Sequence, residues 1–135
     1  MKMILLITLL TLLNLNVFAP EADVIYIERS QPVTPYEAIW TAVCRVESNF
    51  DAEAIGDKNL KEWSYGIAQI RQVRLDDYNE RTGNSYTIKD VFDIDISKKI
   101  FMYYCFGSDM ESIARSWNGS GPKTIKYWDK VKEVL

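Results

Sequence analysis

Apolar residues recur every three or four positions over residues 34–50, the spacing of one face of an amphipathic helix. This face consists of Ile39, Trp40, Val43, Val46 and Phe50. At the start of the segment, Thr34, Pro35 and Glu37 occupy the N-cap, first and third positions of a capping box. We therefore predict a helix that begins at Thr34 and carries Glu47 near its C-terminal end.

Further helical segments follow a polar, turn-rich connection over residues 51–65, which has a short hairpin as its alternative structure. The second helix is predicted over about 68–82, and it should end at Gly83, a residue that readily adopts the left-handed conformation. A short helical turn is then expected over 87–92.

Three more helices complete the predicted pattern. Asp93 is expected to cap a helix with Ile96, Ile100, Tyr103 and Tyr104 on one side, and Ser108 with Glu111 forms a capping box for a helix that ends near Trp117. The last helix has an apolar stripe at Ile125, Trp128, Val131 and Leu135. Because no long alternating stretch bounded by hairpin turns is present, we expect an all-α domain, with a mainly helical α+β fold as the alternative.

The N-terminal residues are typical of an export signal. Lys2 is followed by an apolar stretch, and residues 17–19 are suited to signal peptidase. We predict a signal peptide at 1–19, an arm at 20–33 and the functional domain at 34–135. Pro20 would follow the cleaved bond and disfavours processing, so a retained membrane anchor is the alternative. The domain is expected in the periplasm or outside the cell.

Composition excludes several partners. The chain has 135 residues, enough for one domain, with 16 basic and 19 acidic side chains. Lys2 is the only charged residue in 1–19, so the mature chain has a net charge of −4. This balance gives no basic surface for nucleic acid, and we expect a monomer that binds none.

The residue inventory narrows the chemistry further. The chain has no histidine, which excludes serine or cysteine triads and imidazole metal sites, so neither a metal nor a cofactor is expected. Cys44 and Cys105 are the only cysteines; in an oxidising compartment they could form a disulfide, and otherwise they are two small buried side chains.

Glu47 is the strongest candidate for catalysis. A helix C-terminus carries partial negative charge, which should raise the pKa of a carboxyl group there, and apolar neighbours should raise it further. A carboxylic acid that is protonated near neutral pH can donate its proton to a glycosidic oxygen. The ordinary alternative is a solvated helical glutamate.

Three short motifs resemble the soluble lytic transglycosylase domain, which is related to goose-type lysozymes. They are Glu-Ser-Asn-Phe at 47–50, Tyr-Gly-Ile-Ala-Gln-Ile at 65–70 and Ala-Arg-Ser-Trp-Asn-Gly at 114–119, followed by a late tyrosine, Tyr127. The resemblance covers 34–135 and implies a lysozyme-like domain that cleaves peptidoglycan between N-acetylmuramic acid and N-acetylglucosamine. Glu47 would be the catalytic acid and then the base, giving a 1,6-anhydromuramic product. The implied substrate-binding residues are Ser48, Tyr65, Gly66, Gln69, Trp117, Asn118 and Tyr127.

Alternatives remain at several of these positions. Gly66 suits a turn, Gln69 a helix start, Trp117 a core and Asn118 a helix cap. The chain also departs from the family at Ile67 and Ala68, where Leu and Met are common, and at Trp117, where Tyr is common.

Two other functions fit the same sequence. Asp51, Glu53 or Asp57 could activate water for a hydrolytic muramidase, or serve only as solvated turn carboxylates. The domain could also be a silent glycan-binding scaffold. Peptidoglycan strands are the expected partner, and a cell-envelope or secretion-apparatus partner is a further option.

Overall fold

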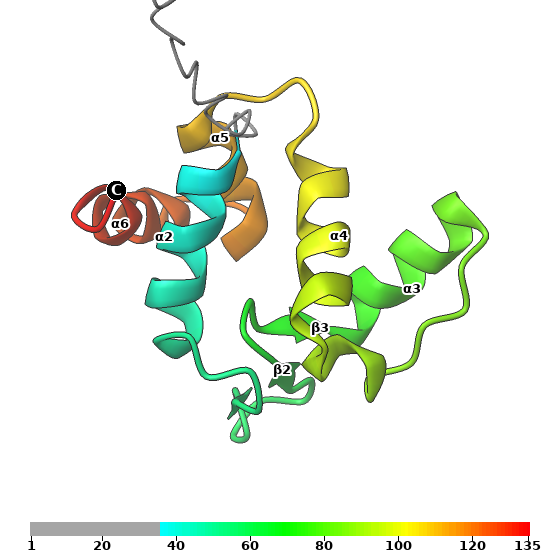
Figure 1. Cartoon of the computed structure of the whole chain (residues 1–135). Coiled ribbons are helices and arrows are strands. Elements are labelled where there is room, and N and C mark those ends of the chain that lie inside the picture. The colour runs from blue at the N-terminus through cyan, green and yellow to red at the C-terminus, as the bar shows by residue number, and fades with distance from the viewer. Residues whose placement is uncertain (1–35) are drawn as a thin grey trace, which may run out of the picture. The chain divides into compact units, whose positions relative to one another are not determined.

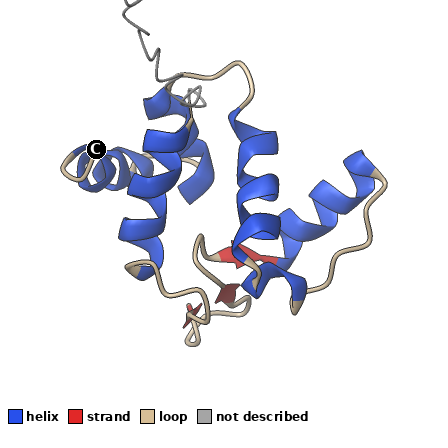
Figure 2. Cartoon of the chain, in the orientation of Figure 1, coloured by secondary structure: helices blue, strands red, loops and turns tan. Residues whose placement is uncertain are grey.

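The computed structural model describes residues 36–135, and Figure 1 shows a set of helices with a small sheet toward the lower end of the view. The predicted signal peptide, the arm at 20–33 and the capping residue Thr34 lie outside the described residues. Five α-helices, one 3-10 helix and three two-residue strands make up the described part (Figure 2). The described part is therefore mainly helical with a small sheet, which is compatible with the all-α prediction and with its α+β alternative.

Helix α2 (Glu37–Ser48) carries Glu47 in its last turn, as predicted, but its N-cap is Tyr36, so Glu37 is the first helical residue and not the third. Ile39, Trp40 and Val43 are buried, whereas Phe50 lies beyond the helix and is 42% exposed. The helix ends because Asn49 is left-handed, with φ 53°, and its N–H donates to the Arg45 carbonyl at 3.0 Å.

The sheet consists of β1 (Ile55–Gly56), β2 (Ser64–Tyr65) and β3 (Ile70–Arg71), paired antiparallel in that order. Tyr65 lies opposite Ile55 and Ile70, and Ser64 lies opposite Gly56 and Arg71. The hairpin alternative for the connection is therefore the correct one. Since side chains alternate along a strand, Ser64 and Tyr65 point to opposite faces of this sheet.

Helix α3 (Gln72–Thr82) begins four residues later than predicted. Gln69 has a positive φ of 53°, which interrupts a helix, and Ile70 and Arg71 pair with β2 instead. The predicted end is confirmed: Gly83 has φ 72° and its N–H donates to the Asn79 carbonyl.

The short turn is the 3-10 helix η1 (Asp90–Phe92), and α4 (Ile94–Cys105) follows. Asp93 caps α4, as predicted, because its side chain accepts from the N–H groups of Asp95 and Ile96. The buried face of α4 differs from the predicted one. It consists of Ser97, Ile100, Phe101 and Cys105, while Tyr103 is 41% exposed.

The last two helices pack against each other and against α2. Helix α5 (Met110–Asn118) is capped by Asp109 rather than by Ser108, one residue later than predicted. Helix α6 (Lys123–Lys132) buries Thr124, Tyr127 and Val131. The predicted stripe is wrong for Ile125 and Leu135, which are about half exposed.

Aromatic rings join these helices into one core. Phe101 of α4 lies between Trp40 of α2 and Trp117 of α5, with ring centroids 5.2 Å and 4.8 Å away. Cys44 and Cys105 are both free and buried, and burial raises the pKa of each thiol to about 12. The cysteines therefore act as small core side chains, and the disulfide is not formed.

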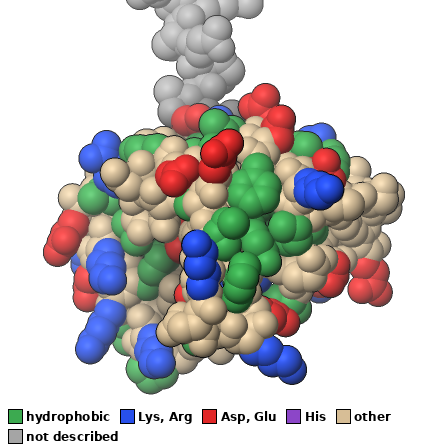
Figure 3. Space-filling view, turned by 90° about the horizontal axis from the view of Figure 1, so that it is seen from below, with side chains coloured by type: hydrophobic (Ala, Val, Ile, Leu, Met, Phe, Trp, Pro, Cys, Tyr) green, Lys and Arg blue, Asp and Glu red, His purple; other side chains and the backbone are tan. Residues whose placement is uncertain are grey.

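Some large apolar side chains stay on the surface. Phe106, after α4, is 89% exposed, and Trp63, before β2, is 43% exposed. On the face seen from below, apolar side chains gather in a cluster between charged ones (Figure 3).

Candidate functional site

Glu47 is held by a residue eighty positions away. The Tyr127 hydroxyl, on the buried face of α6, donates a 2.6 Å hydrogen bond to Glu47 Oε1. Because α2 and α6 pack together, the last turn of α2 faces the middle of α6. The apolar stripe predicted for this helix does not include Tyr127, but the residue is only 7% exposed and contacts the acid from the core side.

The pKa of the Glu47 carboxyl is raised from 4.5 to about 7, mainly because burial removes it from water. The charge of Asp57 raises it further, while the Tyr127 hydrogen bond and the charges of Arg71 and Arg74 lower it. The upward shift agrees with the prediction, but burial is its main cause. At neutral pH both the acid and the carboxylate forms of Glu47 are populated.

Glu47 opens into a hollow of about 330 Å³, which we call the Glu47 hollow. The hollow is lined by Glu47, Asp57, Gln69, Arg71, Val73, Arg74, Trp117, Asn118 and Gly119. The lining therefore combines the ends of α2 and α5 with the sheet and the start of α3. It brings together three of the predicted substrate-binding residues, Gln69, Trp117 and Asn118, beside the predicted acid.

Gln69 lines the hollow but uses its amide within the protein. Its Oε1 accepts from Ser64 Oγ at 2.7 Å, and its Nε2 donates to the Gly66 carbonyl at 2.9 Å. These bonds hold the turn that precedes β3 in its left-handed conformation. Gln69 therefore shapes the wall, and its amide N–H groups are directed to backbone carbonyls.

Trp117 lines the hollow and belongs to the core, since it is buried. Its Nε1–H donates to the Ala68 carbonyl at 3.0 Å, so this N–H is engaged within the protein. The Arg74 guanidinium lies over the indole ring, 4.1 Å from its centroid. The core alternative is correct for Trp117, and one ring face is covered by a cation.

Asn118 is the most available polar group among the predicted residues. It is the exposed last residue of α5, and its side chain makes no hydrogen bond within residues 36–135. An amide in this position can donate to or accept from a ligand in the Glu47 hollow.

Two predicted residues support the site without lining it. Ser48 Oγ donates to the Ile67 carbonyl at 2.8 Å, which ties the end of α2 to the segment before β3. Gly66 is buried with φ 72°, and a Cβ there would approach the Val91 carbonyl oxygen to 2.6 Å. Glycine is thus required for packing against η1, which is a structural role.

Tyr65 lies away from the Glu47 hollow. Strand alternation places it on the face of the sheet opposite Ser64, where its ring meets Phe92 edge-on, 6.2 Å between centroids. There it lines a separate hollow of about 390 Å³ with Lys61, Glu62, Trp63 and Gln72.

One of the three candidate bases shares the hollow with Glu47. Asp57 lines it and pairs with Arg71 at 2.6 Å. Asp51 is exposed and accepts from the N–H of Glu53, as expected for a turn carboxylate.

Arg71 and Arg74 were missed by the sequence reasoning. Their position directly after the 65–70 motif is the feature of the sequence that could have identified them as site residues. Their orientation, however, depends on the pairing of β3 and on packing against α5. Arg74 Nη2 donates to the carbonyls of Ser116 and Trp117, at 3.2 Å and 3.0 Å. Burial lowers the pKa of Arg74 from its usual value.

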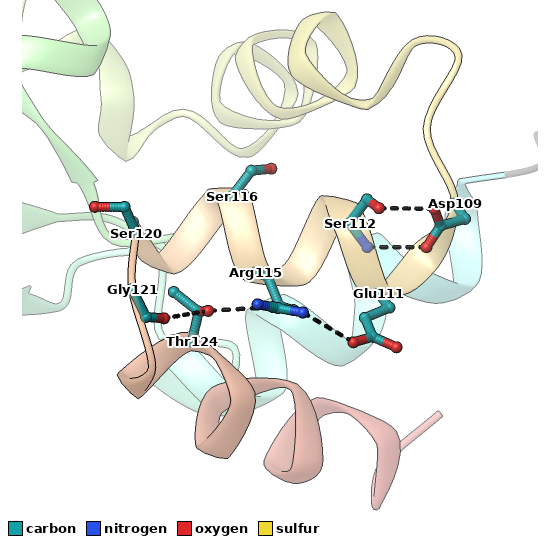
Figure 4. A pocket seen from close by; sticks show the side chains of 9 residues that line it. Asp109, Glu111, Ser112, Arg115, Ser116, Ser120, Gly121 and Thr124 are labelled. Atoms are coloured by element: carbon teal, nitrogen blue, oxygen red, sulfur yellow. Dashed lines mark hydrogen bonds and ion pairs between the residues drawn. The ribbon is translucent and has the colours of Figure 1, made fainter.

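A larger hollow of about 540 Å³ lies between α5 and α6, and we call it the Arg115 hollow. Its side chains bond to one another (Figure 4). Arg115 donates to Glu111 and to Thr124, both at 3.2 Å, and Ser112 donates to Asp109. The Arg115–Thr124 bond joins α5 to α6, whereas the other two lie within α5 and its cap. None of the predicted site residues lines this hollow.

Comparison of the chain with family models, with curated proteins and with solved structures gave no match. Within residues 36–135, no helix is long and apolar enough to cross a membrane.

Proposed function

We propose that this domain cleaves peptidoglycan as a lytic transglycosylase with a lysozyme-like fold. The observation that carries the proposal is Glu47: its carboxyl group has a pKa of about 7 and faces an open hollow. A group with this pKa can give up a proton and take one back near neutral pH, which a two-step acid and base reaction requires. The mainly helical fold and the ordered motifs support the same proposal.

In the first step, protonated Glu47 donates its proton to the oxygen between N-acetylmuramic acid and N-acetylglucosamine, and the C1–O bond breaks. The N-acetyl group of the substrate stabilises the positive charge that develops at C1, so no second carboxylate is needed. In the second step, the Glu47 carboxylate removes the proton of the muramoyl 6-hydroxyl, and this oxygen bonds to C1. The product is a 1,6-anhydro ring, and Glu47 is protonated again.

Tyr127 positions Glu47 for both steps. Its hydroxyl donates to Oε1, which leaves Oε2 for substrate and stabilises the carboxylate formed after the first step.

Asp57 supports hydrolysis as a second candidate function. Because it lines the same hollow, it is placed better than Asp51 to activate a water molecule. Its ion pair with Arg71 holds its carboxylate at the wall of this hollow.

Digestion of purified peptidoglycan, with sugar ends identified by mass, tests the proposal. Anhydromuramic ends with the wild type, reduced about 100-fold or more by Glu47→Gln, are expected. Glu53→Gln is the matched control, since Glu53 is exposed and lies outside the Glu47 hollow. Reducing muramic ends would favour hydrolysis, and binding without cleavage by the wild type would favour a scaffold.

A further inference from the structure

Arg74 is a half-buried cation at the wall of the Glu47 hollow. Helix α3 carries it, and its guanidinium lies 4.1 Å from the Trp117 ring centroid and 5.1 Å from that of Tyr104. Its Nη2 donates to two carbonyls at the end of α5, a position that favours positive charge. These contacts fix the guanidinium in one place.

No carboxylate lies within ion-pair distance of Arg74 in the part of the chain that the structure describes. The other arginine that lines the hollow, Arg71, is paired with Asp57. Buried charges are normally paired, because their removal from water costs free energy. The Nε and Nη1 groups of Arg74 also make no hydrogen bond among the described residues.

The charges of the hollow do not balance while Glu47 is protonated. Asp57 offsets Arg71, so the charge of Arg74 remains. Asn118 lines the same hollow with a side-chain amide that makes no hydrogen bond within residues 36–135. A fixed guanidinium and a nearby amide donor match the two oxygens of a carboxylate.

We propose that Arg74, with Asn118 beside it, binds a carboxylate of the substrate, so that the domain selects an acidic glycan over a neutral one. This inference rests on the proposed function for the identity of the sugar. In peptidoglycan the carboxylate has two sources: the lactyl group of muramic acid where the peptide is removed, and the peptide stem, through its glutamate or its C-terminus, where the peptide is present.

Binding to the Glu47→Gln form of the full-length chain tests the inference without cleavage. Calorimetry would compare a neutral N-acetylglucosamine tetramer with a peptide-free tetrasaccharide that contains muramic acid. Two stem-bearing tetrasaccharides, one with free stem carboxylates and one with the glutamate and the C-terminus amidated, separate the two sources. At least one acidic fragment should bind about tenfold or more tightly than the neutral tetramer, with the preference declining in high salt.

Adding Arg74→Met should abolish this preference, whereas Arg81→Met should keep it, because Arg81 lies on the same helix but outside the hollow, paired with Asp77. Arg74→Met also removes contacts with α5 and risks misfolding. Asn118→Asp avoids this risk: it leaves Arg74 in place, adds a negative charge to the hollow, and should also abolish the preference.

Equal affinity for acidic and neutral fragments, no measurable binding of the acidic fragments, or a preference unchanged by both hollow variants would overturn the anion site. These binding results are independent of the test of the proposed function, which is the digestion of peptidoglycan by the wild type. An acid preference that depends on Arg74 in a protein that cleaves nothing would support the anion site and reject the enzyme.

Discussion

The Glu47 hollow and the Arg115 hollow both contain acidic and basic side chains, but these side chains differ in how far they are hydrogen-bonded or ion-paired within the protein. In the Arg115 hollow, the arginine donates to the glutamate and to the threonine, and the capping aspartate accepts from Ser112. In the Glu47 hollow, the acid has a pKa of about 7, and Arg74 has no carboxylate partner among the described residues.

This difference is the one we expect between a structural site and the proposed catalytic site. Polar groups that satisfy one another have little left to offer a ligand, and they stabilise the packing of the elements that carry them. Groups that are buried without full compensation carry a free-energy cost, which substrate contacts can offset. The size of a hollow is therefore a poor guide to its role, since the Arg115 hollow is the larger of the two.

The largest expected effect concerns the cost of ionising Glu47. Because its pKa in the folded protein, about 7, exceeds the ordinary 4.5, the native state binds the proton more tightly than the unfolded chain does. The free energy of unfolding should therefore fall as pH rises from 4.5 to 7. Glu47→Gln removes this cost and should raise the free energy of unfolding by up to about 3 kcal/mol near pH 8, and hardly at all near pH 4.

Urea unfolding at both pH values measures this effect. The matched variant is Glu111→Gln in the Arg115 hollow. It breaks the exposed ion pair between Glu111 and Arg115 within α5, and this loss should change the free energy of unfolding by less than about 0.5 kcal/mol. If Glu47→Gln changes the free energy of unfolding equally at pH 4 and pH 8, Glu47 ionises normally. The proposed difference between the two hollows would then be wrong.

The next effect concerns Tyr127. Tyr127→Phe removes the 2.6 Å hydrogen bond that favours ionised Glu47, so the pKa of Glu47 should rise further. Cleavage should decline at high pH, where Glu47 has lost the proton that it donates, and this high-pH decline should move upward in the variant. The free energy of unfolding near pH 8 should fall by about 2 kcal/mol, with a smaller loss near pH 4.

Thr124→Val is the corresponding change in the Arg115 hollow. Thr124 donates to the Gly121 carbonyl and accepts from Arg115, and the loss of these bonds should cost about 1 kcal/mol. That loss should be equal at both pH values, because hydroxyl and guanidinium groups keep their charge over this range. An equal loss for Tyr127→Phe at both pH values would show that its bond does not depend on the charge of Glu47.

Features that depend on neighbouring residues were predictable from the sequence. The last turn of α2, the Asp93 cap and the Gly83 terminus follow from local side-chain chemistry, and all three are found. The start of α3 was not predictable, because the positive φ of Gln69 depends on bonds to Ser64 and Gly66 and on pairing with β2.

The candidate site likewise contains features that depend on neighbouring residues and features that depend on contacts between distant parts of the chain. Glu47 could be identified from its motif, and the upward direction of its pKa shift from its apolar neighbours, since burial is the main cause of that shift. Tyr127 was chosen from the motif order, but the apolar stripe put it on the wrong side of α6. Arg74 was missed because its role arises from contact with Trp117 and the end of α5, more than forty positions along the chain.

The smallest expected effect concerns Asp57, whose charge raises the pKa of Glu47. Asp57→Asn removes that charge and leaves Arg71 without its partner, and both changes favour ionised Glu47. The high-pH decline of cleavage should therefore move slightly downward, opposite in sign to the change for Tyr127→Phe. Asp51→Asn, in an exposed turn, should leave the decline unchanged.

The same variant distinguishes the two roles of Asp57 through its products. If Asp57 acts only through its charge, Asp57→Asn should retain anhydromuramic ends at a similar rate, measured by mass at a pH below the decline. If Asp57 activates water, the wild type should produce reducing ends, and the variant should lose them. A pKa shift without a change in product would make Glu47 the only carboxyl group in this hollow that exchanges protons with the substrate.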